Sequence, residues 1–240
     1  MAQVAVETRL VDLTTAVGPQ LFRALREMII NNELTPGMRL SEADVAASFG
    51  VSRQPVRETF IKLAEEGLVE VRPQRGTFVR KISTGAVMDA RFVREAIEAD
   101  IVKLVAQDSD VALVAALTHL LDAQRSVALN DPKSFVPLDD AFHRTLAEAA
   151  GKANAWRVIE GTKSQMDRVR QLSTVQFPTA RLIDQHTAIV KAIAAQNPAA
   201  AEAAMRGHLR AILLDLPVIR QSLPEYFDDP DPLPGKSGYK

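Results

Sequence analysis

Cysteine is absent from the 240-residue sequence. Its absence excludes disulfide bonds, metal sites built from thiolates and catalysis by a cysteine nucleophile. Long apolar runs are also missing, and none approaches the ~20 residues that a bilayer-spanning helix needs. The first residues, Met1 to Glu7, lack the basic segment and apolar core of a secretory signal. These absences predict a soluble cytoplasmic protein that does not associate with membranes.

An excess of charge of either sign is missing as well. The formal net charge is −1, with 11 basic and 10 acidic residues in the segment 1–82 and 18 and 20 in the remainder. If the protein binds nucleic acid, a few well-placed arginines must supply the attraction, because no broad basic field is expected. The composition, 47% hydrophobic and 25% charged, is typical of a globular chain of one large or two modest domains.

The first part of the chain carries start and stop signals for three helices. Apolar residues at helical spacing predict the first helix over residues 17–32. Ser41 and Asp44 form a pair like a capping box that starts the second helix, and Gly50 ends it. A third helix over residues 52–66 begins with a serine cap and ends at a glycine.

A β-hairpin is predicted directly after these helices. Residues 68–71 alternate between apolar and polar side chains, residues 73–76 form a turn, and residues 77–80 return. Helices joined by a short turn and followed by a hairpin are the outline of a winged helix-turn-helix. We therefore predict such a domain over residues 1–82.

The third helix has one apolar face and one polar face. The apolar face would pack on the first two helices, and it consists of Val56, Phe60 and Leu63. Arg53, Gln54 and Arg57 then point away from this core, where recognition helices reach guanine edges and phosphates in the major groove. The alternative is that these residues are solvated surface charges.

The remainder of the chain shows helical periodicity and no strand pattern. Six helices with short links are expected, at residues 84–107, 110–129, 134–150, 153–173, 179–196 and 198–221. We predict an all-helical bundle over residues 83–223. The tail 224–240 is rich in proline and aspartate and is expected to be disordered.

Histidines within this helical part suggest a metal site. Asp139 and His143 are four residues apart and project from one face of a single helix, while His186 and His208 lie on two later helices. One carboxylate and three imidazoles from three helices would suit zinc or a similar divalent ion. Spacing alone leaves open whether these helices converge, and the alternative is a set of unrelated surface or core histidines.

The N-terminal strings resemble a known family. Residues 36–42 read P-G-M-R-L-S-E, residues 50–58 read G-V-S-R-Q-P-V-R-E, and E-G-L-V and R-G follow at 66–69 and 75–76. This order is similar to the DNA-binding domain of GntR-family bacterial regulators. The resemblance implies operator contacts from Arg39, Arg53 and Arg57. The full set expected to contact DNA is Arg39, Ser52, Arg53, Gln54, Arg57, Arg75, Gly76 and Thr77.

The helical part resembles the FCD ligand-binding domain of the FadR subfamily. Residues 94–98 (R-E-A-I-E) are similar to its R-x-x-L-E string, and residues 139–143 (D-D-A-F-H) to its D-x-x-F-H string. The resemblance implies a divalent metal, with zinc first and nickel or manganese as alternatives. It implies four ligands, which are Asp139, His143, His186 and His208. His119 matches nothing in the pattern, and Asp140 falls on the wrong face of its helix.

Relatives with such a metal set bind small organic acids, so a carboxylate effector is implied. Arg94 is the leading anchor for it, because a guanidinium binds a carboxylate through two parallel hydrogen bonds. Gln165 and Arg168 are further candidates. The alternative for Arg94 is an ion pair with Glu98, four residues along the same helix.

Together these features predict a homodimeric, metal-dependent regulator that binds double-stranded operator DNA, acts as a repressor and is released by a small organic acid. Two alternatives remain. One is a metal-dependent enzyme acting on a small organic acid with an appended DNA-binding head, although no further motif such as H-E-x-x-H supplies a catalytic base. The other is a DNA binder that ignores effectors and contains a structural metal.

Overall fold

The computed structural model describes residues 11–12, 14–131 and 134–228 of the chain. These residues form two compact units. The N-terminal unit runs to Thr84 and also includes the segment from Leu223, whereas the helical unit runs from Gly85 to Ser222. Within the described ranges, no helix combines the length and apolar character needed to span a membrane.

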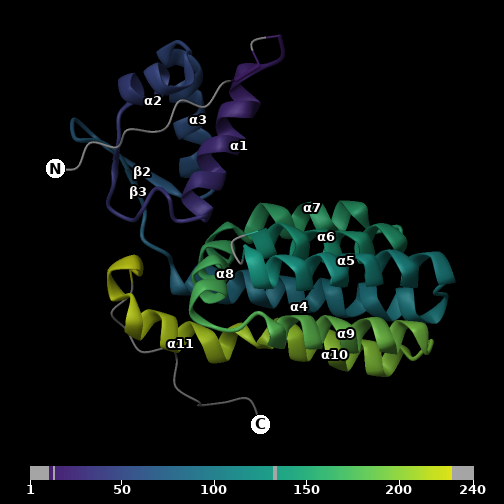
Figure 1. Cartoon of the computed structure of the whole chain (residues 1–240). Coiled ribbons are helices and arrows are strands. Elements are labelled where there is room, and N and C mark those ends of the chain that lie inside the picture. Colours follow the sequence, from purple (N-terminus) through teal and green to yellow (C-terminus); the bar gives the residue numbers. More distant parts are fainter. Residues whose placement is uncertain (1–10, 13, 132–133, 229–240) are drawn as a thin grey trace. The chain divides into compact units, whose positions relative to one another are not determined.

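The N-terminal unit combines helices with a small antiparallel sheet (Figure 1). Its elements are α1 (Val17–Ile30), β1 (Arg39–Leu40), α2 (Glu42–Phe49), α3 (Arg53–Glu65), β2 (Val69–Arg72) and β3 (Gly76–Val79). The strand order is β1-β3-β2, with Arg39 opposite Phe78 and Val71 opposite Thr77. The predicted hairpin is confirmed. Strand β1 was not predicted, because two residues are too short to show alternation.

Local capping fixes the turn between α2 and α3. The backbone N–H of Asp44 donates to the hydroxyl of Ser41 at 3.3 Å, and Gly50 adopts a left-handed conformation with φ of 64°. Side chains from all three helices then share one core, which includes Leu21, Leu25, Ile29, Val45, Phe49, Val56, Phe60 and Leu63. The predicted winged helix-turn-helix is therefore present.

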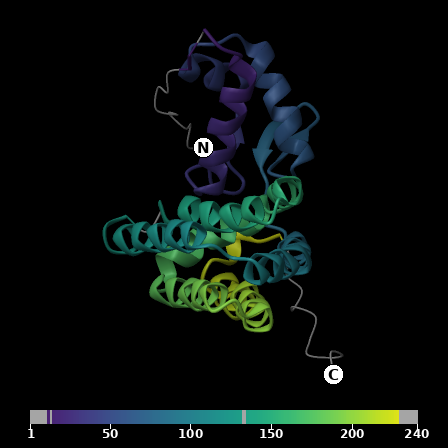
Figure 2. The ribbon, with the colours of Figure 1, turned by 90° about the vertical axis from the view of Figure 1, so that its right-hand side faces the viewer.

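The helical unit contains eight α-helices within its described residues. They are α4 (Thr84–Gln107), α5 (Val111–Asn130), α6 (Phe135–Ala149), α7 (Ala153–Thr162), α8 (Ser164–Gln176), α9 (Ala180–Ala194), α10 (Pro198–Arg210) and α11 (Ile212–Ser222). Figures 1 and 2 show α9 and α10 running side by side. The predicted class, a winged helix-turn-helix followed by a helical bundle, is confirmed.

Two of the predicted helices are each divided into two. The segment 153–173 breaks at Lys163, whose ammonium is buried between the carboxylates of Asp140 and Asp167 at 2.5 Å from each. The segment 198–221 breaks at Ala211, where the backbone N–H bonds to the carbonyl of His208, three residues back. Apolar periodicity cannot show either break, because both depend on polar and backbone contacts.

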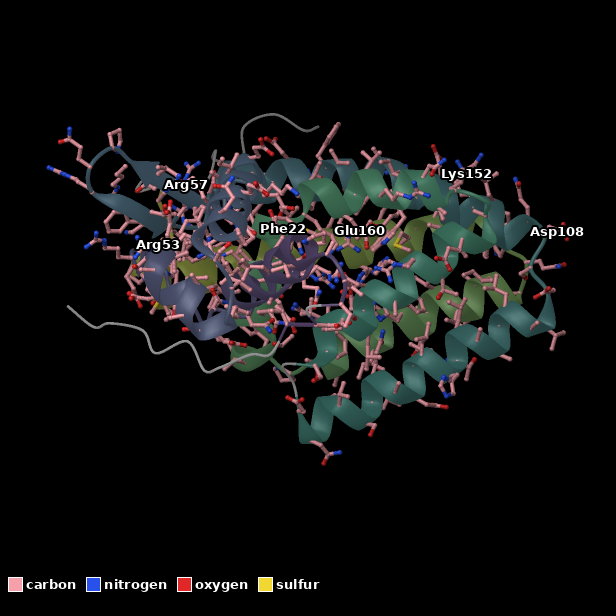
Figure 3. All side chains as sticks on the ribbon, turned by 90° about the horizontal axis from the view of Figure 1, so that it is seen from above. Phe22, Arg53, Arg57, Asp108, Lys152 and Glu160 are labelled. Atoms are coloured by element: carbon pink, nitrogen blue, oxygen red, sulfur yellow. The ribbon has the colours of Figure 1, made fainter. Side chains whose placement is uncertain are left out.

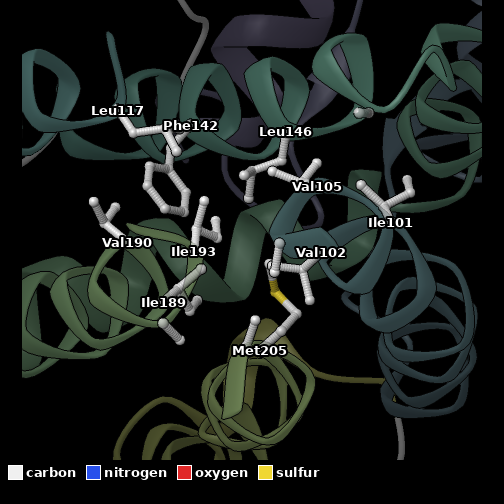
Figure 4. Packing of buried hydrophobic residues seen from close by; sticks show 14 of the residues in the cluster. Ile101, Val102, Val105, Leu117, Phe142, Leu146, Ile189, Val190, Ile193 and Met205 are labelled. Atoms are coloured by element: carbon white, nitrogen blue, oxygen red, sulfur yellow. The ribbon is translucent and has the colours of Figure 1, made fainter. Parts of the chain in front are cut away.

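Apolar side chains from six helices form the core of the helical unit (Figure 4). Val102 and Val105 of α4, Phe142 and Leu146 of α6, and Ile193 of α9 are at most 4% exposed. Residues of α5, α7 and α10 complete the cluster, among them Leu117, Trp156 and Met205. This packing fixes the rotation of each helix about its axis, and so decides which polar side chains meet inside the unit.

Residues 224–228, the first part of the tail expected to be disordered, are folded. Residues Pro224–Tyr226 form a 3-10 helix (η2), and Phe227 is only 4% exposed. The backbone N–H of Ile82 donates to the carbonyl of Tyr226 at 2.8 Å, and that of Asp228 donates to the carbonyl of Ile82 at 3.2 Å. The buried ring of Phe227 and two backbone hydrogen bonds thus order this segment despite its polar composition. Residues 229–240 lie outside the described part of the chain.

We expect Phe227→Ala to lower the free energy of unfolding of the N-terminal unit by about 3 kcal/mol, because a buried aromatic ring is removed. Urea denaturation of the full chain measures this change. Glu225→Ala is the control, since Glu225 is exposed two residues away and should change stability by less than about 0.5 kcal/mol. Equal stabilities of the two variants would contradict a packing role for the ring.

Candidate functional site

The start of α3 presents polar side chains to solvent. Ser52, Arg53, Gln54 and Arg57 are exposed, whereas Val56 between them is fully buried. Figure 3 labels Arg53 and Arg57 on this helix. The surface position predicted for the arginines is therefore observed, and their guanidinium groups do not pack into the protein core.

Arg57 has a partner that the sequence did not reveal. Its Nε and Nη2 donate to the two carboxylate oxygens of Glu42, at 3.1 and 3.0 Å, while its side chain stays 61% exposed. These hydrogen bonds hold the pKa of Glu42 below its usual value. Because Glu42 begins α2, the ion pair orients Arg57 from the neighbouring helix and leaves its guanidinium open to solvent.

The wing brings Arg39 and Gly76 together. Gly76 has φ of 105°, a conformation that favours glycine, and a Cβ built on it would lie 3.0 Å from Nε of Arg39. Arg75 at the turn is exposed. Thr77, which was also expected to contact DNA, is only 7% exposed, because alternation along β3 turns its side chain inward.

The four predicted metal ligands converge inside the helical unit. Asp139 and His143 of α6, His186 of α9 and His208 of α10 are all buried, and one donor atom of each lies within 4.8 Å of the others. Nε2 of His208 is 3.1 Å from Nε2 of His143 and 3.3 Å from Nε2 of His186. Oδ1 of Asp139 is 3.3 Å from Nε2 of His186. The fourth histidine, His119, is exposed on α5.

The second ring nitrogen of each clustered histidine faces an oxygen atom. Nδ1 of His143 lies against the carboxylate of Glu98. Nδ1 of His186 is 2.8 Å from Oε1 of Gln124, and Nδ1 of His208 is 3.1 Å from Oε1 of Gln185. The amide of Gln124 is itself oriented, because its Nε2 donates to the carbonyl of Leu138 at 3.2 Å.

These contacts leave three lone pairs aimed at one point. An oxygen acceptor at Nδ1 places the proton there, so the Nε2 atoms have no hydrogen to share across the 3.1 and 3.3 Å gaps. Bonds of about 2.1 Å to a shared ion would place donor atoms about 3.0–3.4 Å apart. Burial lowers the pKa of His186 to about 3 and that of His208 well below its usual value, which keeps both rings neutral. The donor set therefore fits a divalent metal.

Ion pairing fixes the orientation of Asp139, the one carboxylate of the set. Its Oδ2 pairs with Nη2 of Arg170 on α8, while Oδ1 faces the histidines. Burial opposes its ionisation, but Arg170 and the histidines outweigh this and hold the pKa of Asp139 well below its usual range. The adjacent Asp140 points elsewhere, as expected, and pairs with Lys163 and Arg170.

A pocket adjoins the cluster. The empty space within it, counted together with the open solvent at its mouth, is about 520 Å³. Asp139 and His208 lie in its wall together with Arg94 and Arg170. The remaining lining is mainly apolar, from Phe135, Val136, Met166, Leu182, Leu209, Ala211 and Ile212, with Ser173, Thr174 and Asp215 as further polar groups.

Of the three residues predicted to anchor an effector, only Arg94 lines the pocket. Arg94 lines the pocket and also forms the alternative ion pair, because its Nε donates to Oε1 of Glu98 at 2.6 Å. Gln165 and Arg168 are buried and are not among the pocket-lining residues. Arg170 lies in the wall instead. Sequence reasoning missed it because α8 is polar on most faces and lacks an apolar stripe that would define its rotation.

Comparison with known proteins agrees with this two-part arrangement. Residues 19–79 match the profile "Bacterial regulatory proteins, gntR family", and residues 89–211 match the profile "FCD domain". The chain is 39% identical over 226 residues to the HTH-type transcriptional repressor RspR of Escherichia coli K12, covering 93% of this chain and 99% of that protein.

Solved structures show the same fold. A GntR transcriptional regulator from Rhodococcus sp. RHA1 is 28% identical with a TM-score of 0.68, covering 85% of this chain and 99% of its own. McbR/YncC of E. coli has a TM-score of 0.72 at 16% identity, covering 87% and 99%, and so shares the fold. The chain thus belongs to the GntR family of bacterial transcriptional regulators, within the FadR-like group that carries an FCD domain, and is a regulator rather than an enzyme.

Proposed function

We propose that this protein is a metal-dependent repressor that binds operator DNA as a homodimer and releases it when a small carboxylate enters the helical unit. One observation carries the proposal more than any other. A buried set of one carboxylate and three imidazoles borders a pocket lined by two arginines, in the same chain as an exposed recognition helix.

DNA binding depends on a small number of guanidinium groups. Arg53 and Arg57 at the start of α3 would enter the major groove, and Arg39 with Arg75 and Gly76 of the wing would contact the backbone or the minor groove. Ser52 and Gln54 flank these arginines and add hydrogen-bonding groups. Since phosphate contacts release counterions, operator affinity should fall steeply as salt increases.

Asp139, His143, His186 and His208 would hold the metal, with zinc as the first choice and nickel or manganese as alternatives. Bound there, the ion would attract an anionic oxygen atom of a ligand in the adjoining pocket. The chain itself prepares this environment, because Arg170 fixes the carboxylate of Asp139 and the outer hydrogen bonds fix the imidazole rings.

Charge at the pocket favours an anionic effector. Four acidic and three basic side chains form ion pairs at or beside the cluster and sum to −1 before a metal is counted: Glu98, Asp139, Asp140, Asp167, Arg94, Lys163 and Arg170. Asp215 in the pocket wall is paired with Arg181 and leaves this sum unchanged. A divalent ion would change the sum to +1. Because an uncompensated buried charge is costly, a monoanionic carboxylate is the preferred occupant.

The homodimer is proposed from an apolar stripe on α4. Phe92 is 65% exposed, and Met88 and Ala96 lie one turn to either side of it on the same face. Large exposed aromatic side chains are enriched at protein interfaces. A dimer would present two recognition helices to the two halves of a pseudo-palindromic operator.

The proposal as a whole is tested by a thermal-shift screen of zinc-loaded protein against small organic acids, followed by operator binding with each hit. A ligand that binds only the folded state raises the melting temperature, and the proposal expects that a hit weakens operator binding. If hits stabilise the protein but leave operator affinity unchanged, the metal and pocket do not control DNA binding. Turnover of a hit would instead indicate an enzyme.

We expect Arg53→Ala to reduce specific operator affinity about 10–100-fold, because a contact to base edges is removed, while melting temperature and metal content stay unchanged. Fluorescence anisotropy with a labelled operator measures the affinity. Arg157→Ala, which removes an exposed positive charge from α7, is the matched control and should bind as the wild type. Loss of the fold in Arg53→Ala would contradict the surface role of this arginine.

His186→Ala should lose bound metal and the stabilisation that zinc gives to the wild type, because one of four ligands is removed. Elemental analysis of purified protein gives the stoichiometry. His119→Ala replaces the exposed histidine of α5 and should retain a full complement of metal. Equal stoichiometry in the two variants would rule out the proposed ligand set.

Phe92→Asp should shift the protein from dimer to monomer, since a charge would be placed in the proposed interface. Analytical ultracentrifugation reports the mass in solution. Val111→Asp makes a similar change at a valine that is 87% exposed at the start of α5, and this variant should remain dimeric. A dimeric Phe92→Asp protein would show that the interface lies elsewhere.

A further inference from the structure

Glu98 lies between the metal ligands and the pocket. Its side chain is 3% exposed, and one carboxylate oxygen lies against Nδ1 of His143 while the other accepts from Nε of Arg94 at 2.6 Å. His143 belongs to the proposed metal set, and Arg94 lines the pocket. Glu98 therefore contacts both parts of the site while belonging to neither.

We propose that Glu98 is a positioning residue that sets the metal affinity of the cluster through His143, and that Arg94 weakens this action by drawing on the same carboxylate. This inference rests on the proposed metal site. It gives the Arg94–Glu98 ion pair of α4 a role in metal binding in addition to any contribution to stability.

The three clustered histidines differ in the strength of their outer partner. Only His143 has a carboxylate beside its Nδ1, whereas Nδ1 of His186 and Nδ1 of His208 face the neutral amides of Gln124 and Gln185. A charged acceptor at Nδ1 increases the electron density at Nε2 more than an amide does, and so makes the ring a better metal ligand. His143 is accordingly the ligand whose strength the protein can adjust most.

Arg94 acts on the same carboxylate in the opposite direction. Its Nε and Nη2 both approach Glu98, at 2.6 and 3.4 Å. The positive charge of Arg94 draws electron density from this carboxylate, so the carboxylate polarises His143 less. The ion pair with Arg94, whose side chain is as deeply buried as that of Glu98, provides the charge that balances this carboxylate. An anion that binds Arg94 from the pocket would compete with Glu98 for the guanidinium and strengthen His143 as a ligand.

Zinc affinity of the full-length protein, measured by competition with a chromophoric chelator, tests the role of Glu98. Glu98→Gln keeps an oxygen acceptor for His143 but removes the charge, and we expect zinc affinity to fall about 10–100-fold. Glu95→Gln is the matched control, because Glu95 lies one turn earlier on α4 and pairs with Arg91, Arg206 and Arg210, none of which is a proposed ligand. It should bind zinc as the wild type does. Equal affinities of Glu98→Gln and Glu95→Gln would overturn the proposal.

A gain-of-function variant covers the case in which Glu98→Gln fails to fold. Gln185 is half-buried, so Gln185→Glu can carry a charge, and it would give His208 the carboxylate partner that His143 already has. We expect this variant to bind zinc several-fold more tightly than the wild type. Unchanged or weaker binding would contradict the idea that a charged outer partner sets the affinity.

A double-mutant cycle separates action through Glu98 from a general electrostatic effect. Arg94→Met alone should tighten zinc binding, by up to about tenfold, because the competing cation is removed. The same substitution in the Glu98→Gln background should change zinc affinity little, since the shared carboxylate is gone. If the effects of the two substitutions on zinc affinity are additive, Arg94 acts on the metal directly, and action of Arg94 through Glu98 is rejected.

Sodium acetate serves as the probe for the pocket, with sodium chloride at the same ionic strength as its reference. We expect acetate to raise the zinc affinity of the wild type more than that of Arg94→Met. An equal response would show that acetate acts at the metal alone. Wild-type protein that binds no zinc at all would refute the proposed function itself, whereas one zinc per chain with unaffected variants would refute only this inference.

Discussion

The helical unit is organised by the need to compensate buried charge. Asp139 is ionised in an almost water-free interior, and such a group is tolerated only if neighbouring charges and hydrogen bonds replace its solvation. Arg170 provides the opposite charge, and Asp140 and Asp167 in turn balance Arg170 and Lys163. Removing Arg170 would leave Asp139 without its basic partner, so the cluster constrains the positions of α6 and α8 together.

The same helices supply the apolar core and the clustered aspartate and histidines. Phe142 packs in the core and stacks on the ring of His186, with centroids 4.4 Å apart, while its neighbour His143 turns toward the other ligands. A site placed on packed helices keeps its geometry because the core fixes each rotamer. In the N-terminal unit, by contrast, Glu42 orients Arg57 through an ion pair at a solvent-exposed surface.

Local sequence signals determined the elements and much of the site. Capping at Ser41, the left-handed glycine at Gly50 and the apolar stripe of α3 act within a few residues, so the winged helix-turn-helix and the outward position of Arg53 were predictable. The identity of the clustered aspartate and histidines followed from short motifs. The helix limits of α4 were also predicted, because its apolar repeat continues without interruption to Gln107.

Tertiary structure alone decided how these parts meet. Whether three helices bring His143, His186 and His208 within bonding distance of one ion depends on how each helix is rotated by its packing, and spacing along the chain contains no such information. The same reason explains why Arg170 replaced Arg168 in the pocket wall. Phe227 is buried and pairs with Ile82, which lies 145 residues earlier in the chain. Such a long-range contact cannot be predicted from the local composition.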